Sequence, residues 1–449
     1  MRTVCFVDRL ELDCPGNLFN QALAIGDVDN DKGNEVVVGN VTGQMRVFKL
    51  TDSRPWGYCS DLGMITCIGV GDICNLGRNF IVCLTAEGKC HIFDLRSLAN
   101  EVPNSDSKEK EKETMDDISA SYQMKPTFTQ QLEANSRVML LGDLNSDGKM
   151  ALVIGYSDRA VRQFQWQESE DEDASSVLGG KIVQIERWQL AGQIGSITLN
   201  ASPDGIQELM VAQPGGTFVT LIKTNDKKPK ESPPSPTGTT KPPSPGSPTH
   251  VCPSLVYHPL GSSMARNNCV SSEVVGGIRR AKSESTQTFY AVATLDGTVM
   301  MIENDKILWS LQVDHQLFGL SKLDITGNQN DEVIVCSWDG QTYIVDHGRE
   351  VVRFHFDENV AAFAAGHFAL TDQQNIPCLI YVTFSNKMYI YYDITMPQVH
   401  TTNLIKTMEK EKELPDILAC LNVDGSNQSE VREFYHWCLY GNMQRIHDT

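Results

Sequence analysis

The sequence has little positive charge compared with its negative charge. Its 449 residues include 38 Lys and Arg against 57 Asp and Glu, which gives a net charge of −19 at pH 7. Proteins that bind nucleic acid present basic surfaces to the phosphates, so the composition excludes that class of partner. Direct docking on anionic lipid is excluded on the same ground, because it needs clustered Lys and Arg.

Long apolar runs are also missing. No stretch reaches the roughly 20 apolar residues that a membrane-spanning helix needs. The first five residues lead into an alternating strand rather than a signal-peptide segment. Thirteen cysteines are present, and several of them lie inside apolar strands. Buried free cysteines pack as small hydrophobic groups, so we expect a cytoplasmic protein with no direct membrane insertion.

The sequence lacks the motifs of common catalytic sites. It contains no His-Glu-x-x-His, no Cys-x-x-Cys pair and no nucleophile elbow, and its ten histidines are scattered. Gly-rich pieces such as residues 213–216 lack the strand–loop–helix setting of a phosphate cradle and read as hairpin turns. We therefore expect a protein without enzymatic activity.

One acidic segment carries a pattern that is typical of metal-binding loops. Asp27, Asp29, Asp31 and Glu35 occupy positions one, three, five and nine of a loop between two apolar triplets. Calcium takes about six to eight oxygen ligands, so these side chains predict a calcium site in the first repeat loop. Lys32 stands at position six, where such loops usually have Gly. The alternative is that the carboxylates accept hydrogen bonds from turn amides and hold the loop without an ion.

The framework of this segment recurs along the chain. Each copy has an apolar strand, a polar loop, a short apolar strand, a small-residue turn and an alternating strand. The seven copies span residues 22–49, 65–95, 138–166, 194–223, 274–303, 317–347 and 361–393. The third and sixth loops keep parts of the acidic pattern and are degenerate metal candidates: Asp143, Asn145, Asp147, Asp324, Asn328 and Glu332.

A further alternating strand precedes the inner strands of the repeats, as at residues 185–190 and 351–356. Four short antiparallel strands repeated radially predict an all-β fold, a seven-bladed β-propeller over residues 3–396. Residues 4–12 have the form of a fourth strand, and we expect them to close the ring beside residues 388–391, because closure removes exposed sheet edges. A β-sandwich is the alternative, but a sandwich would not repeat the same loop chemistry in every unit.

Three insertions interrupt the repeats and are expected to be flexible: residues 101–125, 167–180 and 224–254. The first of them is expected between blades two and three. Beyond the propeller, apolar residues recur at three- and four-residue steps, which predicts a short helical tail over residues 397–449. One helix is expected at residues 431–439, with Gly441 as its stop signal. Further helices are expected near residues 404–408 and after Pro415.

The loop sequences DVDNDKGNEVVVG, GDLNSDGKMALVIG and LDITGNQNDEVIV resemble the FG-GAP repeats of integrin α-chain propellers. The segment DGQTYIVDH, at residues 339–347, resembles a family of FG-GAP repeat proteins that are subunits of KICSTOR, a complex at the lysosomal surface. This resemblance covers nearly the whole chain except the insertions and the distal tail. It implies co-subunits that include kaptin and a very large scaffold protein. Through them the GATOR GTPase-activating complex is recruited, which restrains mTOR complex 1 under amino-acid or glucose shortage.

Two classes of function are open at this point. The first is a non-enzymatic interaction scaffold that is peripheral at the lysosomal membrane. The second is a calcium-dependent, integrin-like extracellular binding or adhesion module. In a scaffold, a few exposed aromatic anchors are expected to carry the binding energy. Trp56, Trp338 and Tyr343 are candidates for such anchors, and the sequence assigns no partner-binding residue beyond them.

Overall fold

The computed structural model describes residues 2–4, 8–14, 16–96, 121–168, 178–202, 204–222, 254–258, 269–281, 287–304, 306–371, 374–394, 396 and 428–441. The chain divides into two compact units, Met1–Met396 and Pro397–Thr449. The first unit contains every described strand, and the second contains the helix α4.

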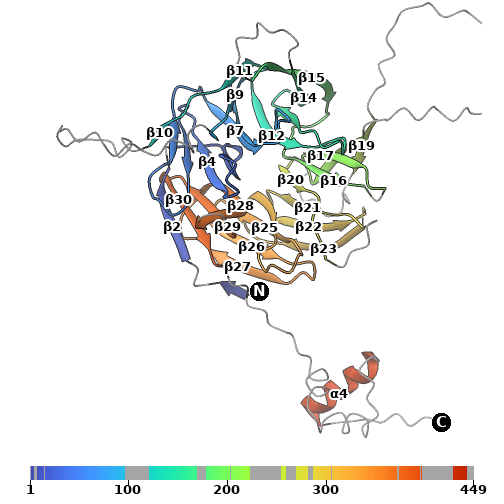
Figure 1. Cartoon of the computed structure of the whole chain (residues 1–449). Helices are drawn as coiled ribbons and strands as arrows, with labels where there is room; N and C mark the ends of the chain where they lie inside the picture. The colour runs from blue at the N-terminus through green and yellow to red at the C-terminus, as the bar shows by residue number, and fades with distance from the viewer. Residues whose placement is uncertain are drawn as a thin grey trace, which may run out of the picture. The chain divides into compact units, whose positions relative to one another are not determined.

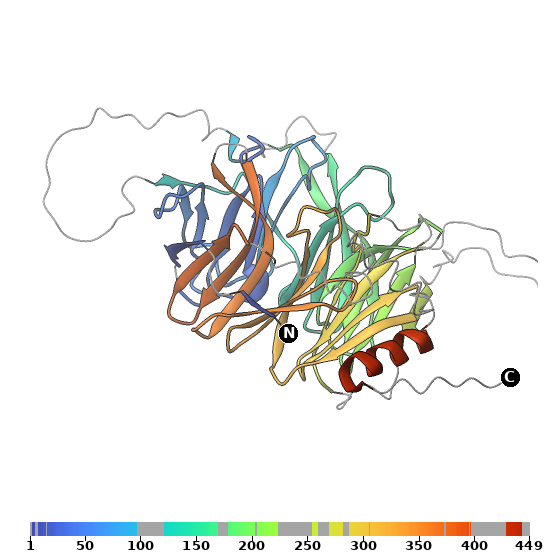
Figure 2. The ribbon, with the colours of Figure 1, turned by 90° about the horizontal axis from the view of Figure 1, so that it is seen from below.

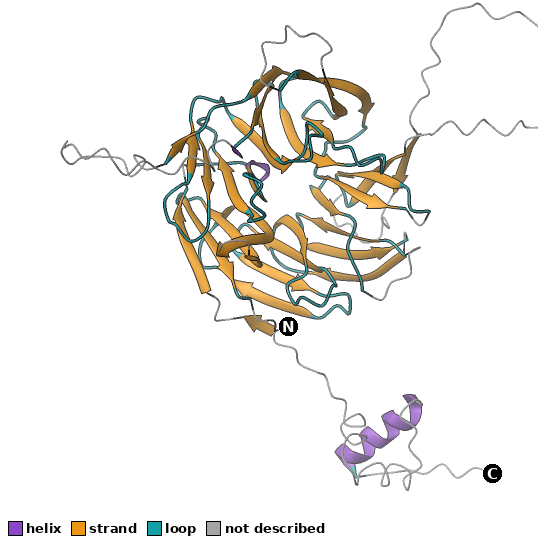
Figure 3. Ribbon diagram, in the orientation of Figure 1, coloured by secondary structure: helices purple, strands orange, loops and turns teal. Residues whose placement is uncertain are grey.

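The described strands form seven sheets that are arranged as blades around a ring (Figure 1), and the regular elements of the first unit are nearly all strands, which loops connect (Figure 3). The first strand of each blade is innermost and contacts the first strand of the next blade, up to the contact between the last blade and the first. The strand β4 shows the local reason: its sequence EVVVG is buried at every position, which suits β-branched residues. The predicted all-β, seven-bladed propeller is confirmed.

The first four blades follow the chain from the innermost strand outward. Blade one is β3 (Leu23–Gly26), which follows the short 3-10 helix η1 (Asn20–Ala22), then β4 (Glu35–Gly39), β5 (Met45–Phe48) and β6 (Gly57–Cys59). Blade two is β7 (Ile65–Gly71), β8 (Phe80–Thr85), β9 (Lys89–Phe93) and β11 (Phe128–Gln131). Blade three is β12 (Ser136–Gly142), β13 (Ala151–Tyr156), β14 (Ala160–Glu168) and β15 (Gly180–Gln189). Blade four is β16 (Ile197–Ala201), β17 (Gln207–Gln213), β18 (Thr217–Ile222) and β19 (Ser254–His258).

The last three blades complete the ring. Blade five is β20 (Ser272–Val275), β21 (Phe289–Thr294), β22 (Thr298–Glu303) and β23 (Lys306–Gln312). Blade six is β24 (Leu317–Leu323), β25 (Glu332–Ser337), β26 (Gln341–Val345) and β27 (Val351–His355). Blade seven is β28 (Val360–Thr371), β29 (Gln374–Thr383), β30 (Lys387–Tyr392) and β2 (Asp8–Asp13).

The N-terminal segment closes the ring as predicted, although the closing strand is Asp8–Asp13 and Val4, which was expected in it, pairs with Phe354 of blade six. The strand β2 pairs antiparallel with β30, with Leu10 opposite Ile390 and Leu12 opposite Met388. In Figure 1 the blue β2 lies beside the orange β30, and Figure 2, turned by 90°, also shows blue strands next to orange ones. The first part of the chain therefore supplies the outermost strand of the last blade.

Hydrophobic packing joins each blade to its neighbours. The described residues contain seven clusters of buried side chains, and each cluster lies between two adjacent blades. The cluster between blades seven and one includes Leu12 of β2, Val36 of β4 and Ile380 of β29. Burial of each such side chain contributes about 1.5–3 kcal/mol. The closing interface is thus packed in the same way as the others.

Two blades carry an additional short strand. The strand β1 (Arg2–Val4) runs parallel to β27 of blade six, and β10 (Tyr122–Gln123) runs parallel to β6 of blade one. The expectation that residues 101–125 separate blades two and three is therefore wrong. These residues precede β11, the outermost strand of blade two, and their end pairs with blade one. Most of the three insertions lies outside the described residues.

The strand directions define two ends of the ring. Neighbouring strands of a blade are antiparallel, so turns between first and second strands and turns between third and fourth strands lie at the same end. We call this end the loop face, because it carries the acidic loops. The opposite end, which carries turns between second and third strands and the connections between blades, is the turn face. The third strands β9, β14 and β18, which precede the three insertions along the chain, end at the loop face.

The second unit contains α4 (Gln428–Tyr440), which confirms the short helical tail. Gly441 ends the helix with a φ of 72°, and its N–H donates to the carbonyl oxygen of Trp437 at 2.8 Å. A left-handed glycine at this place is typical of helix C-termini. The helices predicted near residues 404–408 and after Pro415 lie outside the described residues.

Candidate functional site

The acidic loop of blade one connects β3 to β4 on the loop face. The carboxylate of Asp27 accepts hydrogen bonds from the backbone N–H groups of Asp31 and Lys32, at 3.1 and 3.0 Å. The Oε2 atom of Glu35 accepts one from the N–H of Val28 at 3.0 Å. Side-chain oxygens therefore hold the shape of the loop in the manner of an Asx turn.

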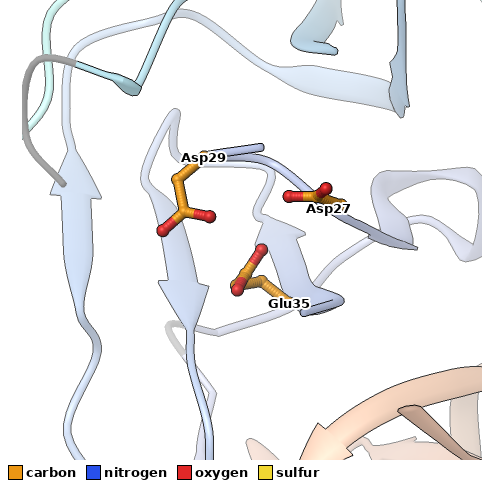
Figure 4. A group of neighbouring side chains, drawn as sticks. All are labelled: Asp27, Asp29 and Glu35. Atoms are coloured by element: carbon orange, nitrogen blue, oxygen red, sulfur yellow. The ribbon is translucent and has the colours of Figure 1, made fainter. Parts of the chain in front are cut away.

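Three of the four predicted ligands of this loop come together. The side chains of Asp27, Asp29 and Glu35 point toward one another (Figure 4), and one oxygen atom from each lies within 4.8 Å of the others. Among the residues that the structure describes, this is the one group of three or more Asp, Glu, His or Cys side chains with such spacing. The repeat pattern in the sequence thus selected three side chains that are neighbours in the structure, and their role as calcium ligands stays a prediction.

Lys49 supplies the positive charge of this cluster. Its Nζ atom forms an ion pair with Asp29 and lies 2.6 Å from Oδ2 of Asp31 and 3.3 Å from Oε1 of Glu35. The side chains of Asp29 and Glu35 are 2% and 0% exposed, and that of Lys49 is 17% exposed. Carboxylates this far from water need a cationic partner, because an isolated buried charge is strongly destabilising.

The pKa shifts follow from burial and from this partner. Burial raises the pKa of Glu35 to about 8, against the opposing effects of the Val28 N–H and the Lys49 ammonium. Burial also raises the pKa of Asp29, although the hydrogen bond from Lys49 opposes the shift. For Lys49, burial lowers the pKa, but its bonds to Asp29 and Asp31 outweigh that effect and raise it. Lys49 is therefore charged throughout the physiological pH range.

The residues present do not fit calcium in this arrangement. Calcium takes about six to eight oxygen ligands, whereas oxygens of Asp29, Asp31 and Glu35 are all directed at the Lys49 ammonium. A second cation at this place would be repelled by the ammonium at short range. The cation that balances the first loop is thus covalently part of the chain.

The third and sixth loops use their carboxylates in the same way as the first. Asp143 accepts hydrogen bonds from the N–H groups of Asp147 and Gly148, at 3.2 and 2.7 Å. Burial is the largest single effect on Asp143 and opposes these bonds, yet the backbone hydrogen bonds together lower the pKa of Asp143. The position that corresponds to Glu35 is Ala151 in this loop, which cannot ligate a metal. Asn145, the remaining predicted residue of the loop, donates its N–H to Asp143 at 3.1 Å.

In the sixth loop, Asp324 accepts from the N–H of Asn328 at 3.1 Å. Glu332 is buried, its Oε2 accepts from the N–H of Ile325 at 2.9 Å, and its Oε1 accepts from the hydroxyl of Thr326 at 3.2 Å. The side chains predicted as degenerate ligands are thus hydrogen-bonded to the loop. Neither the third nor the sixth loop brings three carboxylates together in the described residues.

The acidic loops also connect neighbouring blades. The Oδ1 atom of Asn30 in blade one accepts from the N–H of Asn79 in blade two at 2.7 Å. The Oδ1 atom of Asn75 in blade two accepts from the N–H of Met150 at 2.7 Å, next to blade three. Asn375 of blade seven uses both its side-chain oxygen and its side-chain nitrogen in hydrogen bonds to the backbone of the first loop. The loop face is therefore braced from blade to blade, which is a structural role for these loops.

The three aromatic anchor candidates differ in exposure. Tyr343 is buried, at 3% exposure. Trp56 is half-buried, and its ring packs edge-on against Tyr122 with centroids 5.9 Å apart. Trp338 is 44% exposed on the turn face. Trp338 is thus the one of the three that presents a large apolar surface to solvent.

Lys49 is the site residue that the sequence pattern did not indicate. The pairing register of the strands contains the signal that could have identified Lys49. Val36 of β4 lies opposite Phe48 of β5, so one more step along this antiparallel pair places Glu35 opposite Lys49. A lysine directly after the third strand of a repeat is therefore able to reach the ninth position of its acidic loop.

Comparison with known proteins agrees with the fold and the repeats. The sequence matches the family described as Integrin-alpha FG-GAP repeat-containing protein 2 over residues 49–396. It is 42% identical to the KICSTOR complex protein ITFG2 of Mus musculus over 443 residues, which cover 98% of this chain and 96% of the mouse protein. It is also 42% identical to the protein of the same name from Bos taurus over 419 residues, 92% of this chain and 75% of that protein.

Among solved structures, the chain resembles BBS1N in two crystal structures of its complex with ARL6DN. The TM-scores are 0.52 and 0.56, with 12% and 13% sequence identity over 90% of this chain and all of the other chain. At this identity the likeness concerns the fold alone. No helix in the described part of the chain has the length and apolarity that a bilayer crossing requires. From its matched residues and its relatives, the chain belongs to the integrin-alpha FG-GAP repeat-containing protein 2 family.

Proposed function

We propose that this chain is a non-enzymatic scaffold subunit of the KICSTOR complex. The observation that carries the proposal is its 42% identity, over 98% of its length, to the mouse KICSTOR complex protein. The fold supports it, because seven packed interfaces hold both faces of the ring in a fixed shape. Rigid faces favour docking, since little conformational freedom is lost on binding.

The proposal includes partners and a place in the cell. The other subunits would include kaptin and a very large scaffold protein. Through them the chain would help to recruit the GATOR GTPase-activating complex and so restrain mTOR complex 1 when amino acids or glucose are short. We place it in the cytoplasm, peripheral at the lysosomal membrane. The net charge of −19 favours attachment through other subunits over direct contact with anionic lipid.

The proposed absence of catalysis is supported by how the acidic side chains are used. The cluster of Asp27, Asp29 and Glu35 is engaged with backbone amides and with Lys49. Asp143 and Asp324 accept hydrogen bonds from their own loops. We therefore also propose that the fold requires no metal cofactor.

The calcium-dependent adhesion module is not favoured as the alternative. Such a module needs an open set of oxygen ligands in its repeat loops, and Lys49 takes that place in the first loop. The relatives are named as proteins of the KICSTOR complex. Both observations favour the scaffold.

The proposal is tested by purifying the tagged full chain from cells grown with and without amino acids and by quantifying co-purified proteins with mass spectrometry. We expect kaptin and the other KICSTOR subunits at near-stoichiometric amounts in both conditions, and GATOR subunits in smaller amounts. A tag-only preparation serves as the control. Recovery of no KICSTOR subunit above that control would refute the proposed function.

A further inference from the structure

A pocket on the turn face lies where blades five, six and seven meet. Two of its sides come from turns between second and third strands, the β25–β26 turn with Trp338 and the β29–β30 turn with Phe384. The other sides come from the connections that follow β23 and β27. The pocket has a volume of about 570 Å³ and is lined by Asp314, His315, Gln316, Trp338, Asp339, Asn359 and Phe384.

Two large aromatic side chains of this pocket are exposed to solvent. Trp338 is 44% exposed and Phe384 is 60% exposed. On its protein side, the Trp338 ring packs against Phe318, with centroids 5.9 Å apart and planes inclined by 31°. Exposed aromatic residues that border a pocket are typical anchors of protein–protein interfaces.

The position of Trp338 is fixed before any partner binds. Its carbonyl oxygen accepts from the N–H of Val360 at 2.9 Å, and its N–H donates to the carbonyl of Gln316. Gly340 has a φ of 83°, and a Cβ there would lie 2.1 Å from the carbonyl oxygen of Phe356. The turn is therefore held closely against the connection between blades six and seven. A preorganised anchor loses little entropy on binding.

The charge of the pocket is negative. Asp314 and Asp339 are both exposed, and no Lys or Arg is among the lining residues. The carboxylate of Asp339 accepts hydrogen bonds from Ser337 and from His315, the latter at 2.7 Å. Within the described residues, the carboxylate of Asp314 has no hydrogen-bond or ion-pair partner, so one acceptor group of this pocket is available to a ligand.

We propose that this pocket binds an arginine side chain presented by a segment of a partner protein, with an apolar neighbour of that arginine against Phe384. This inference rests on the proposed scaffold function and names the chemistry of one of its contacts. A guanidinium is planar and stacks on the exposed face of Trp338. Its N–H groups donate in pairs to a carboxylate such as that of Asp314.

The charge of the whole molecule supports the same occupant. The net charge of −19 attracts cationic segments over long range and speeds their encounter. Lysine fits the pocket less well, because its ammonium is compact, strongly hydrated and not planar. An acidic or phosphorylated segment would face repulsion from Asp314 and Asp339. The pocket therefore discriminates among partner segments by both charge and shape.

A direct test uses the purified full chain and a labelled synthetic peptide, acetyl-Ser-Leu-Arg-Ser-amide, measured by fluorescence anisotropy. The matched peptide carries citrulline, which has the shape of arginine without its charge. We expect a Kd of about 1 mM or lower for the arginine peptide and at least about tenfold weaker binding for the citrulline peptide. Equal binding of the two peptides, or no binding of the arginine peptide at about 5 mM, would overturn the proposal.

Variants then locate the binding to this pocket. Asp314→Arg and Trp338→Ala are each expected to weaken binding of the arginine peptide by about tenfold. Asp314 is exposed and has no partner in the described part of the chain, so its replacement leaves the fold intact, and the thermal midpoint checks this. Ile206→Ala, at another apolar residue that is 53% exposed, serves as the matched control and keeps wild-type affinity. Unchanged affinity in both pocket variants would place the peptide elsewhere and refute the inference.

Purification from cells separates this inference from the proposed function. The wild-type chain, the two pocket variants and the Ile206→Ala control are compared for co-purified KICSTOR subunits. We expect the pocket variants to lose one subunit at least fivefold, roughly 1 kcal/mol, while the control loses none. Recovery of no subunit by the wild type would refute the proposed function. Full recovery of every subunit by both pocket variants would refute only the docking role of the pocket.

Discussion

Replacing Lys49 with methionine removes the ammonium from the acidic loop and keeps an unbranched side chain of similar length. Asp29, whose side chain is 2% exposed, then lacks its cation, whereas Glu35, with a pKa of about 8, is mostly neutral at pH 7. Removing one partner of a buried ion pair costs about 3–5 kcal/mol. Because Lys49 keeps 17% exposure, the lower value of about 3 kcal/mol is expected for Lys49→Met.

This cost converts into a measurable shift of the thermal midpoint. Unfolding entropy is about 2 cal/mol/K per residue, so over roughly 400 residues a loss of about 3 kcal/mol lowers Tm by about 4 °C. Lys89→Met is the matched control, because Lys89 is exposed at the start of the third strand of blade two and forms no ion pair among the described residues. We expect Lys89→Met to leave Tm within about 1 °C of the wild type.

Calcium provides the second measurement on the same variants. With the ammonium gone, Asp27, Asp29 and Glu35 regain a set of oxygens suited to a hard cation. A site with a Kd of about 0.1 mM would gain about 2.3 kcal/mol at roughly 5 mM calcium, which restores most of the lost Tm. Wild-type protein and Lys89→Met are expected to show no response in Tm or in calorimetry. The reasoning is refuted if Lys49→Met is as stable as the wild type, or if the wild-type protein binds calcium at this loop.

Three further predictions concern stability. Glu332→Ala leaves the buried N–H of Ile325 without its acceptor and is expected to cost about 1–3 kcal/mol in urea denaturation, whereas the exposed Asp147→Ala should cost well under that. Leu12→Ala opens a cavity in the closing interface, where Leu12 is 1% exposed. It should cost about 2–4 kcal/mol, and an unchanged urea midpoint would argue against closure by β2. Burial lowers the pKa of His91 below 6.5. The unfolded chain therefore binds the proton more readily, and the free energy of unfolding falls as pH drops below about 6.5. The urea midpoint of His91→Gln should fall less between pH 7.5 and 5.5 than that of the wild type.

The architecture was accessible from the sequence because each repeat carries its own periodicity. Apolar triplets such as residues 36–38 must be buried on both faces, and small-residue turns divide the strands at regular intervals. The alternation in residues 4–12 was enough to identify a strand that lacks a local partner, and β2 pairs with β30 as predicted. The N-terminal residues whose alternation predicts a strand are thus also the residues that close the ring.

Features that depend on contacts between distant segments were not accessible in the same way. The strand β10 has two residues, and nothing in Tyr122 and Gln123 indicates that they pair with blade one. The acidic spacing located Asp27, Asp29 and Glu35, but it did not show that a lysine after the next strand lies among them. Among the anchor candidates, Trp338 directly precedes an Asp-Gly turn and Tyr343 lies inside the strand that follows it. The packing of blade six shows that the first is exposed and the second is buried.

The central claim is that a closed seven-bladed ring serves as a rigid platform for other subunits. Single-particle electron microscopy of the complex purified through this chain tests the claim most directly. We predict density for one ring of seven blades, with β2 in the last blade, in contact with another subunit through at least one of its faces. A complex that lacks the ring, or one in which the N-terminal strand is separate from β30, would contradict the account.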